Sequence, residues 1–318
     1  MTAFPLFHLP LVAMEHVLSM MNPYELINLS KTSSRTKRAV KSFSRIRPKF
    51  RIDLGICAQP DIVILGKNES WEYSWTSDQS EIGVTTYARH EIIKFSKNPM
   101  EELKKMYDYI KEVLRCPLEN LYYALNSFPS ENKSITDWLR SQHESIHFVE
   151  INCDLKGFDD DLKYLVSSLK ISGVLSLMVA EYKENFRMEI PESPYCLSVN
   201  CSSFIGYEQF LKLKHSQIVF VASILTDKEI NRFLKSWMSM ESHLELKVFK
   251  IRVSVPEAIN VIMDLPHEVT TEPSVLEMLN EQFKYTYIEC GYNIKRSDGK
   301  MATVCIGDRS NLLHMIIH

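Results

Sequence analysis

The chain has 318 residues, of which 45% are hydrophobic and 24% are charged, a composition typical of folded chains and outside the range of disordered ones. Its length suits about two domains. Only nine glycines occur, and the absence of GxxxxGK(S/T) and GxGxxG motifs argues against nucleotide-dependent chemistry. The net charge of −3 is uneven, because residues 1–51 carry a net +7 and the remainder carries −10. The two ends are therefore expected to have different roles.

The seven cysteines are scattered without a CxxC pair, and we expect them to be free thiols in a reducing compartment. The first basic residue is Lys31, so the start of the chain lacks the cationic segment of a signal peptide. No stretch reaches the ~18 apolar residues of a membrane span. These features predict a cytoplasmic or nuclear location and no membrane partner.

Residues 1–50 are expected to form three helices in quick succession. Pro10 precedes a segment whose apolar residues recur at helical spacing and spread beyond one face. These residues are Leu11, Val12, Met14, Val17, Leu18, Met20 and Met21. Asn22-Pro23-Tyr24-Glu25 combines an N-cap, a proline at the first helical position and a glutamate that can reach back to the cap, so a second helix starts here. The third helix, from about Thr32 to Phe43, is strongly basic.

A unit of this size cannot cover so much apolar surface, since even domains of about 60 residues bury only about 60% of the surface of their unfolded chain. The surplus predicts a protein partner. The basic run from Lys31 to Arg51 could instead bind nucleic acid. It offers no base-stacking aromatic residues except Phe43 and Phe50, which we expect to be buried, so no nucleic-acid partner is predicted.

Between residues 51 and 130 the apolar period changes to two, which predicts short antiparallel strands. The strand-like stretches are residues 50–54, 62–65, 71–75, 82–87 and 91–95. Trp71, Tyr73 and Trp75 share one face of a strand, where a sheet core is favoured over an aromatic ligand cage. Asn98-Pro99 then begins a helix that ends before Pro117.

Beyond residue 130, short apolar strands alternate with helical segments. Strands are expected to begin near residues 147, 174, 196, 217 and 246, and helices to cover 134–142, 159–170, 204–213 and 227–239. Strand-plus-helix repeats of about 20–29 residues are typical of leucine-rich-repeat-like solenoids, here in degenerate form. The tail returns to an antiparallel pattern, with strands at 283–288, 293–296 and 301–306 and a hairpin turn at Asp298-Gly299.

The predicted fold class is α+β and multidomain. Three helices occupy residues 1–50, a small antiparallel β section with a connecting helix occupies 51–130, and a degenerate leucine-rich-repeat-like α/β domain occupies 131–318.

Residues 4–43, FPLFHLPLVAMEHVLSMMNPYELINLSKTSSRTKRAVKSF, resemble an F-box of the kind multiplied in nematodes. The resemblance rests on Leu9-Pro10 before an apolar helix, on Pro23-Tyr24-Glu25-Leu26 at the start of a second helix, and on the basic third helix. Downstream, LTDKEINRFLKSWMSMESHLELKVFKI (225–251) and IKRSDGKMATVCI (294–306) resemble the type-2 F-box-associated domain that follows such F-boxes.

The resemblance implies a non-enzymatic substrate-recognition adaptor of a Skp–cullin–F-box ubiquitin ligase, with no catalytic residue, cofactor or metal of its own. The F-box would dock on the Skp-family linker protein, and through it on a cullin–RING ligase. The domain at 131–318 would bind an unknown target protein for ubiquitination and degradation. The positions implied to contact the linker, or to support that contact, are Leu6, Leu9, Pro10, Met14, Val17, Leu18, Leu26 and Leu29.

The alternative is a zinc-dependent hydrolase, because His143-Glu144-Ser145-Ile146-His147 is a formal HExxH motif. Such a site needs both histidines on one face of a helix and the glutamate to polarise a water. Residues 146–151 alternate as a strand does, so a helix-to-strand loop is favoured. Asp159-Asp160-Asp161 suits a helix N-terminus better than a metal site, because adjacent acids cannot all turn to one ion.

Overall fold

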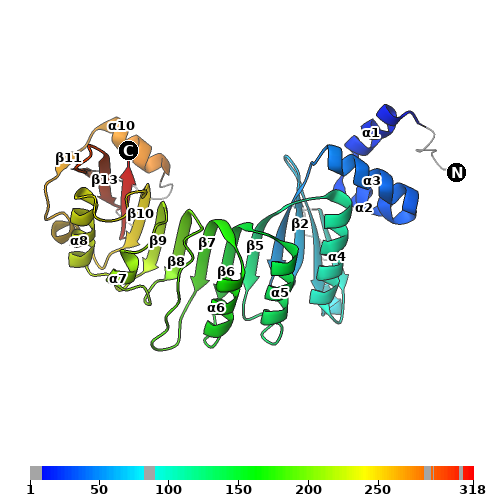
Figure 1. The fold of residues 1–318 in the computed structure, drawn as a ribbon, viewed down its shortest axis with the longest axis horizontal. Coiled ribbons are helices and arrows are strands. Elements are labelled where there is room, and N and C mark those ends of the chain that lie inside the picture. The colour runs from blue at the N-terminus through cyan, green and yellow to red at the C-terminus, as the bar shows by residue number, and fades with distance from the viewer. Residues whose placement is uncertain (1–8, 82–89, 283–287, 289, 308–310) are drawn as a thin grey trace. The chain divides into compact units, whose positions relative to one another are not determined.

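Figure 1 shows the fold as a computed structural model, which describes residues 9–81, 90–282, 288, 290–307 and 311–318. The chain divides into two compact units, Met1–Phe128 and Pro129–His318. The predicted strands at 82–87 and at 283–287 lie outside the described residues. Each unit combines helices with several strands, so both have a mixed α and β architecture.

The first unit opens with three short helices. They are α1 (Leu11–Met20), α2 (Pro23–Thr32) and α3 (Ser34–Ile46), and a fourth helix, α4 (Pro99–Leu114), follows later in the chain. The predicted start of α2 is confirmed, since the Asn22 side chain accepts from the Glu25 amide at 2.9 Å and the Asn22 amide donates to the Glu25 carboxylate at 2.8 Å. A second capping box, between Ser33 and Thr36, starts α3 after a single residue.

Five strands form the sheet of the first unit. They are β1 (Arg51–Ile56), β2 (Asp61–Leu65), β3 (Ser70–Thr76), β4 (His90–Phe95) and β5 (Leu118–Ala124), in the order β5-β1-β2-β3-β4. The prediction of a purely antiparallel section is wrong, because β1/β5 and β3/β4 pair in parallel. Short turns after β1 and β2 allow antiparallel pairs, whereas the longer connections before β4 and β5 allow the crossovers that parallel pairs need.

The aromatic run of β3 belongs to the core of the first unit. Trp71, Tyr73 and Trp75 are all buried, and α4 packs against this strand. The sheet-core interpretation of the three rings is therefore confirmed over the ligand cage.

The second unit contains five consecutive parallel strands, with a helix before the first strand and helices in three of the four connections between them (Figure 1). The strands are β6 (Ile146–Cys153), β7 (Ile171–Val179), β8 (Cys196–Cys201), β9 (Gln217–Ala222) and β10 (Val248–Arg252), and the helices are α5 (Asn132–Gln142), α6 (Asp159–Ser168), α7 (Tyr207–Phe210) and α8 (Asp227–Met238). The five predicted strands and four predicted helices are all present, but the helix predicted at 204–213 is only the four-residue α7. Its register brings Leu175, Leu197, Ile218 and Phe249 into one fully buried row.

The C-terminal part of the second unit is antiparallel. It consists of α9 (Ala258–Ile262), β11 (Glu268–Thr270), α10 (Pro273–Gln282), β12 (Gly291–Lys295), β13 (Met301–Ile306) and β14 (Leu312–Ile317), and β14 pairs with β10. The predicted hairpin joins β12 to β13, and Gly299 adopts the φ of +95° that favours glycine in its turn. Leu279 of α10 packs with Cys305 and Ile316 of the strands.

Candidate protein-binding surface

Among the described residues of the first unit, helix α1 carries the most exposed of the large apolar side chains. Leu11 is 65% exposed, Val12 79% and Met20 66%, although each is an aliphatic or thioether side chain that folding normally covers. Leu18, on the same helix, is fully buried and anchors α1 to the unit. The exposed apolar side chains therefore lie at the two ends of α1, and Leu18 holds the helix against the unit.

The predicted linker-contacting residues divide into two groups. Pro10 is exposed, and Leu9, Met14, Val17 and Leu29 are half-buried. Leu18 and Leu26 are fully buried within the chain, so they can only support the helices that a partner touches. Leu6 lies outside the described residues. The exposed Leu11, Val12 and Met20 were missed as site residues, although the unusual width of the apolar stripe in residues 11–21 was the signal that could have found them.

A hollow of about 360 Å³ adjoins the exposed end of α1, and Met20, Lys49, Phe50 and Trp71 are among its lining residues. The Lys49 ammonium donates to the Ser19 carbonyl at the C-terminal end of α1 and lies 5.9 Å from the centre of the Phe50 ring. Burial lowers the pKa of Lys49. Lysine and ring together connect the end of α1 to the segment that enters β1.

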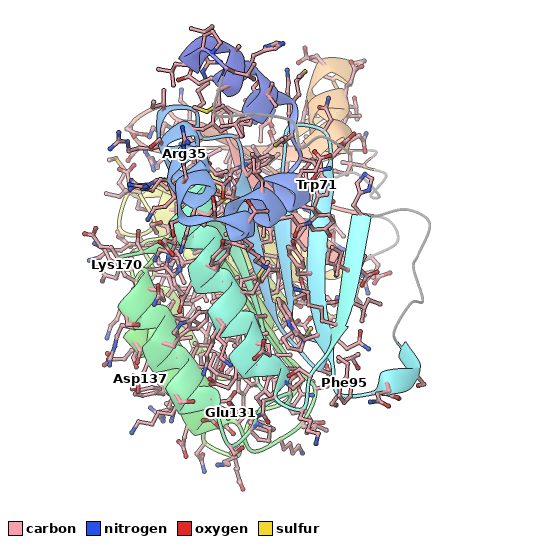
Figure 2. The ribbon with its side chains drawn as sticks, turned by 90° about the vertical axis from the view of Figure 1, so that its right-hand side faces the viewer. Arg35, Trp71, Phe95, Glu131, Asp137 and Lys170 are labelled. Carbon is pink, nitrogen blue, oxygen red and sulfur yellow. The ribbon has the colours of Figure 1, made fainter. Side chains whose placement is uncertain are left out.

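Helix α2 is fastened to the sheet through Tyr24. Its ring meets that of Tyr73 edge to face at 4.8 Å, and its hydroxyl lies within hydrogen-bonding distance of the carbonyl oxygens of Glu72 and His90. Burial is the main cause that raises the pKa of Tyr24 above its ordinary value, so the phenol stays neutral. Figure 2, turned by 90° from the view of Figure 1, labels Trp71, which lines the same hollow as Asn22, the residue before α2.

The basic helix α3 is fastened to α4. Lys37 and Lys41 both pair with the Glu112 carboxylate, at 2.8 and 2.9 Å, and hydrogen bonds from these two lysines lower the pKa of Glu112. The Lys37 ammonium also lies 4.9 Å from the centre of the Tyr109 ring, whose hydroxyl is 2.8 Å from that of Ser30 on α2. Part of the basic charge of α3 therefore serves contacts within the chain.

These contacts determine what the arrangement can do chemically. Helices α2 and α3 are held by the rest of the unit, and apolar side chains remain exposed at both ends of α1. Exposed apolar surface of this kind excludes water when a complementary protein covers it. The first unit is therefore a candidate for protein binding.

The HExxH motif lacks the geometry of a zinc site. His143 follows the last residue of α5 with an extended backbone, and His147 lies within β6, so the two rings do not project from one helix. Among the described residues, no group of three or more His, Cys, Asp or Glu side chains could hold a metal ion. Asp159–Asp161 form the first turn of α6, as predicted.

A second hollow, of about 720 Å³, lies in the second unit between the loop before β8, α7 and α8. Its walls include Phe204 and Tyr207 together with the basic residues Arg187, Lys212 and Arg232. All its lining residues fall between 185 and 232. In the parts of the chain that the structure describes, no helix has both the length and the apolar character that crossing a membrane requires.

Comparison with known families assigns two segments of the chain. Residues 6–47 match the F-box domain, and residues 185–251 match a family described as F-box associated. No curated protein and no solved structure matches the chain. The two matches confirm the resemblance found in the sequence, and the second includes residues 225–251, whereas 294–306 lie beyond it.

The protein thus contains an F-box domain followed by an F-box-associated domain, a combination typical of adaptors rather than enzymes. The helices α1 to α3 span residues 11–46 and fit the F-box. In general terms, these domains support a role as a substrate adaptor of a Skp–cullin–F-box ubiquitin ligase.

Proposed function

We propose that the F-box of this protein docks on a Skp-family linker protein through α1, and that the second unit binds the target protein. The observation that carries the proposal is the exposure of Leu11, Val12 and Met20 on a helix inside the F-box match. Leu9, Pro10, Met14 and Val17 would border the same interface. Leu18, Leu26 and Leu29 would support it from within the helices.

The role in this proposal is proximity. The linker connects the F-box to a cullin–RING ligase, and the F-box-associated domain holds the target where a charged ubiquitin-conjugating enzyme can reach it. We also propose that the second unit is organised like a leucine-rich-repeat domain, because its five parallel strands pair in register and helices lie in three of the four connections between them. Assembly with such a ligase would place the protein in the cytoplasm, the nucleus or both.

The test is a quantitative pull-down of the purified Skp-family linker with the full chain. A Leu9→Ala, Pro10→Ala double variant and a Val12→Asp variant should each weaken binding, because central apolar residues of an interface cost about 2 kcal/mol or more on truncation, roughly a 30-fold loss of affinity. Val269→Asp is the matched control, since Val269 is 62% exposed but lies on β11 of the second unit. Equal recovery of the linker by all variants, or recovery by none including the wild type, would refute the proposal.

A further inference from the structure

The hollow of the second unit has a fixed frame. The loop before β8 is held because Phe186 and Met188 are buried and because the Gln209 side-chain amide donates to the Met188 carbonyl at 2.8 Å. Phe186 packs edge to face on Phe204 at 5.0 Å, and the amide of Lys183 donates to Asp159 at 3.0 Å. A site whose walls are ordered in advance loses little entropy when it binds.

Positive charge gathers around this hollow. Arg187, Lys212 and Arg232 come from three different elements and line the same space, and all three are exposed. Among the residues that the structure describes, none of the three forms an ion pair. The composition of this part of the chain does not explain the cluster, because the residues beyond 51 carry a net charge of −10.

Two carboxylates, Glu208 and Glu229, also line the hollow, and in the described part of the chain neither forms an ion pair with these cations. The Glu229 carboxylate accepts from the Thr226 amide at 2.8 Å and from its hydroxyl at 2.9 Å, as the capping box of α8 requires. Glu208 is exposed at the rim. The Arg232 guanidinium lies 4.6 Å from the centre of the Tyr207 ring, which positions it without consuming its hydrogen-bond donors on a carboxylate.

The hollow also has an apolar part. Phe204 and Tyr207 line it, and Ile224, at 54% exposure, is one of the few large aliphatic side chains of the second unit left open to solvent. Its volume of about 720 Å³ falls within the ~300–1,000 Å³ typical of ligand sites. Apolar wall and unpaired cations together match a ligand that offers a carboxylate next to an apolar side chain.

We propose that this hollow is the target-binding site of the adaptor and that it recognises an acidic linear peptide with an adjacent apolar anchor. The inference rests on the proposed function, since it names the chemistry of the target that the F-box-associated domain would hold. Arg187 and Arg232 pair with the acidic side chains of the peptide, Lys212 adds to the field that attracts them, and Ile224 and Phe204 contact the apolar anchor.

The test uses the full chain and three fluorescein-labelled probes, followed by fluorescence polarisation. One peptide pool places Leu or Phe near paired Asp or Glu residues, the second replaces the acids by Asn or Gln, and the third probe is a short single-stranded RNA. The acidic pool should bind the wild type at least about tenfold more tightly than the amide pool does. Equal binding of both pools, or tighter binding of the RNA, would overturn the inference.

Two sets of variants locate the binding. Arg187→Glu combined with Arg232→Glu, and separately Lys212→Glu, should weaken the acidic pool by about tenfold or more. Lys228→Glu with Lys235→Glu is the matched control, because both lysines are exposed on α8 but do not line the hollow. Equal losses in the site and control variants would show a non-specific charge effect and overturn the inference, and unchanged far-ultraviolet circular dichroism verifies that each variant is folded.

The linker pull-down separates this inference from the proposed function. The Arg187→Glu, Arg232→Glu variant should still recover the Skp-family linker, because the substitutions lie outside the F-box. A wild type that recovers the linker but ignores the acidic pool refutes the peptide site alone. A wild type that binds the acidic pool but never recovers the linker refutes the ligase role alone.

Discussion

Leu18→Ala separates the two roles that residues of α1 can have. Leu18 is fully buried, so its truncation removes core contacts and leaves a cavity, which costs about 3 kcal/mol in comparable Leu→Ala substitutions. Val12, at 79% exposure, makes few contacts within the chain, and Val12→Ala should leave stability within about 0.5 kcal/mol. The same helix thus offers a variant that affects folding and a variant that affects binding.

Native-state hydrogen exchange of the full chain measures how each variant changes the stability of the first unit. Because two compact units need not unfold together, a single global midpoint would mix their responses. A loss of about 3 kcal/mol corresponds to a roughly 100-fold fall in the protection of the slowest amides in α1 and α2. Protection that stays unchanged in Leu18→Ala while affinity for the linker falls would refute the core assignment and show that Leu18 itself contacts the partner.

Three further predictions concern stability. Arg296 holds the pKa of Asp298 at about 2. The pair therefore stabilises the fold above the ordinary carboxylate pKa and loses this effect as the pH falls towards 2. Urea unfolding should show that the loss of stability caused by Asp298→Asn becomes smaller between pH 4 and pH 2. Burial lowers the pKa of His243 to about 4. The free energy of unfolding should therefore decrease as the pH falls from 6.5 towards 4, by up to about 3 kcal/mol. His243→Asn should make this decrease with pH smaller. Glu112→Gln should destabilise by less than about 1 kcal/mol, because the pairs it breaks are half exposed, and added salt should reduce the difference from wild type.

Local signals in the sequence predicted many of the elements. The Asn22-Pro23-Tyr24-Glu25 start of α2 is confirmed as a capping box, since its donors and acceptors lie within one turn of each other. The helix predicted at 227–239 also begins with a capping box, between Thr226 and Glu229. The Asp298-Gly299 turn likewise depends only on neighbouring residues. Features of this kind depend on residues a few positions apart, so they can be predicted without knowledge of the tertiary structure.

The pairing of the strands was harder to predict from the sequence than the elements themselves. Nothing local distinguishes β4 or β5 from antiparallel strands, because their parallel pairing is decided by the length and path of the connection before each strand. The helix α10 was not predicted. The segment after it, 283–288, was predicted as a strand. Its residue Leu279 is buried through contacts with β13 and β14, which lie far from it in sequence.

The candidate site was only partly predictable for the same reason. Apolar spacing predicted that α1 takes part in partner binding but could not tell that Leu18 is buried and Val12 exposed. The cations Arg187, Lys212 and Arg232 form no motif, because about 20 to 25 residues separate each from the next and the repeat of strand and helix brings them together.

The attachment of α2 to the sheet and of α3 to α4 has a practical consequence for anyone who isolates the F-box. A peptide cut after residue 50 would strip Tyr24 of its partners on β3 and β4 and leave Lys37 and Lys41 without Glu112. The smallest fragment that preserves these attachments runs to about residue 128, the end of the first compact unit. In a shorter fragment, α1 to α3 would lack these attachments. Affinities measured on it would therefore not describe the surface that the intact protein presents.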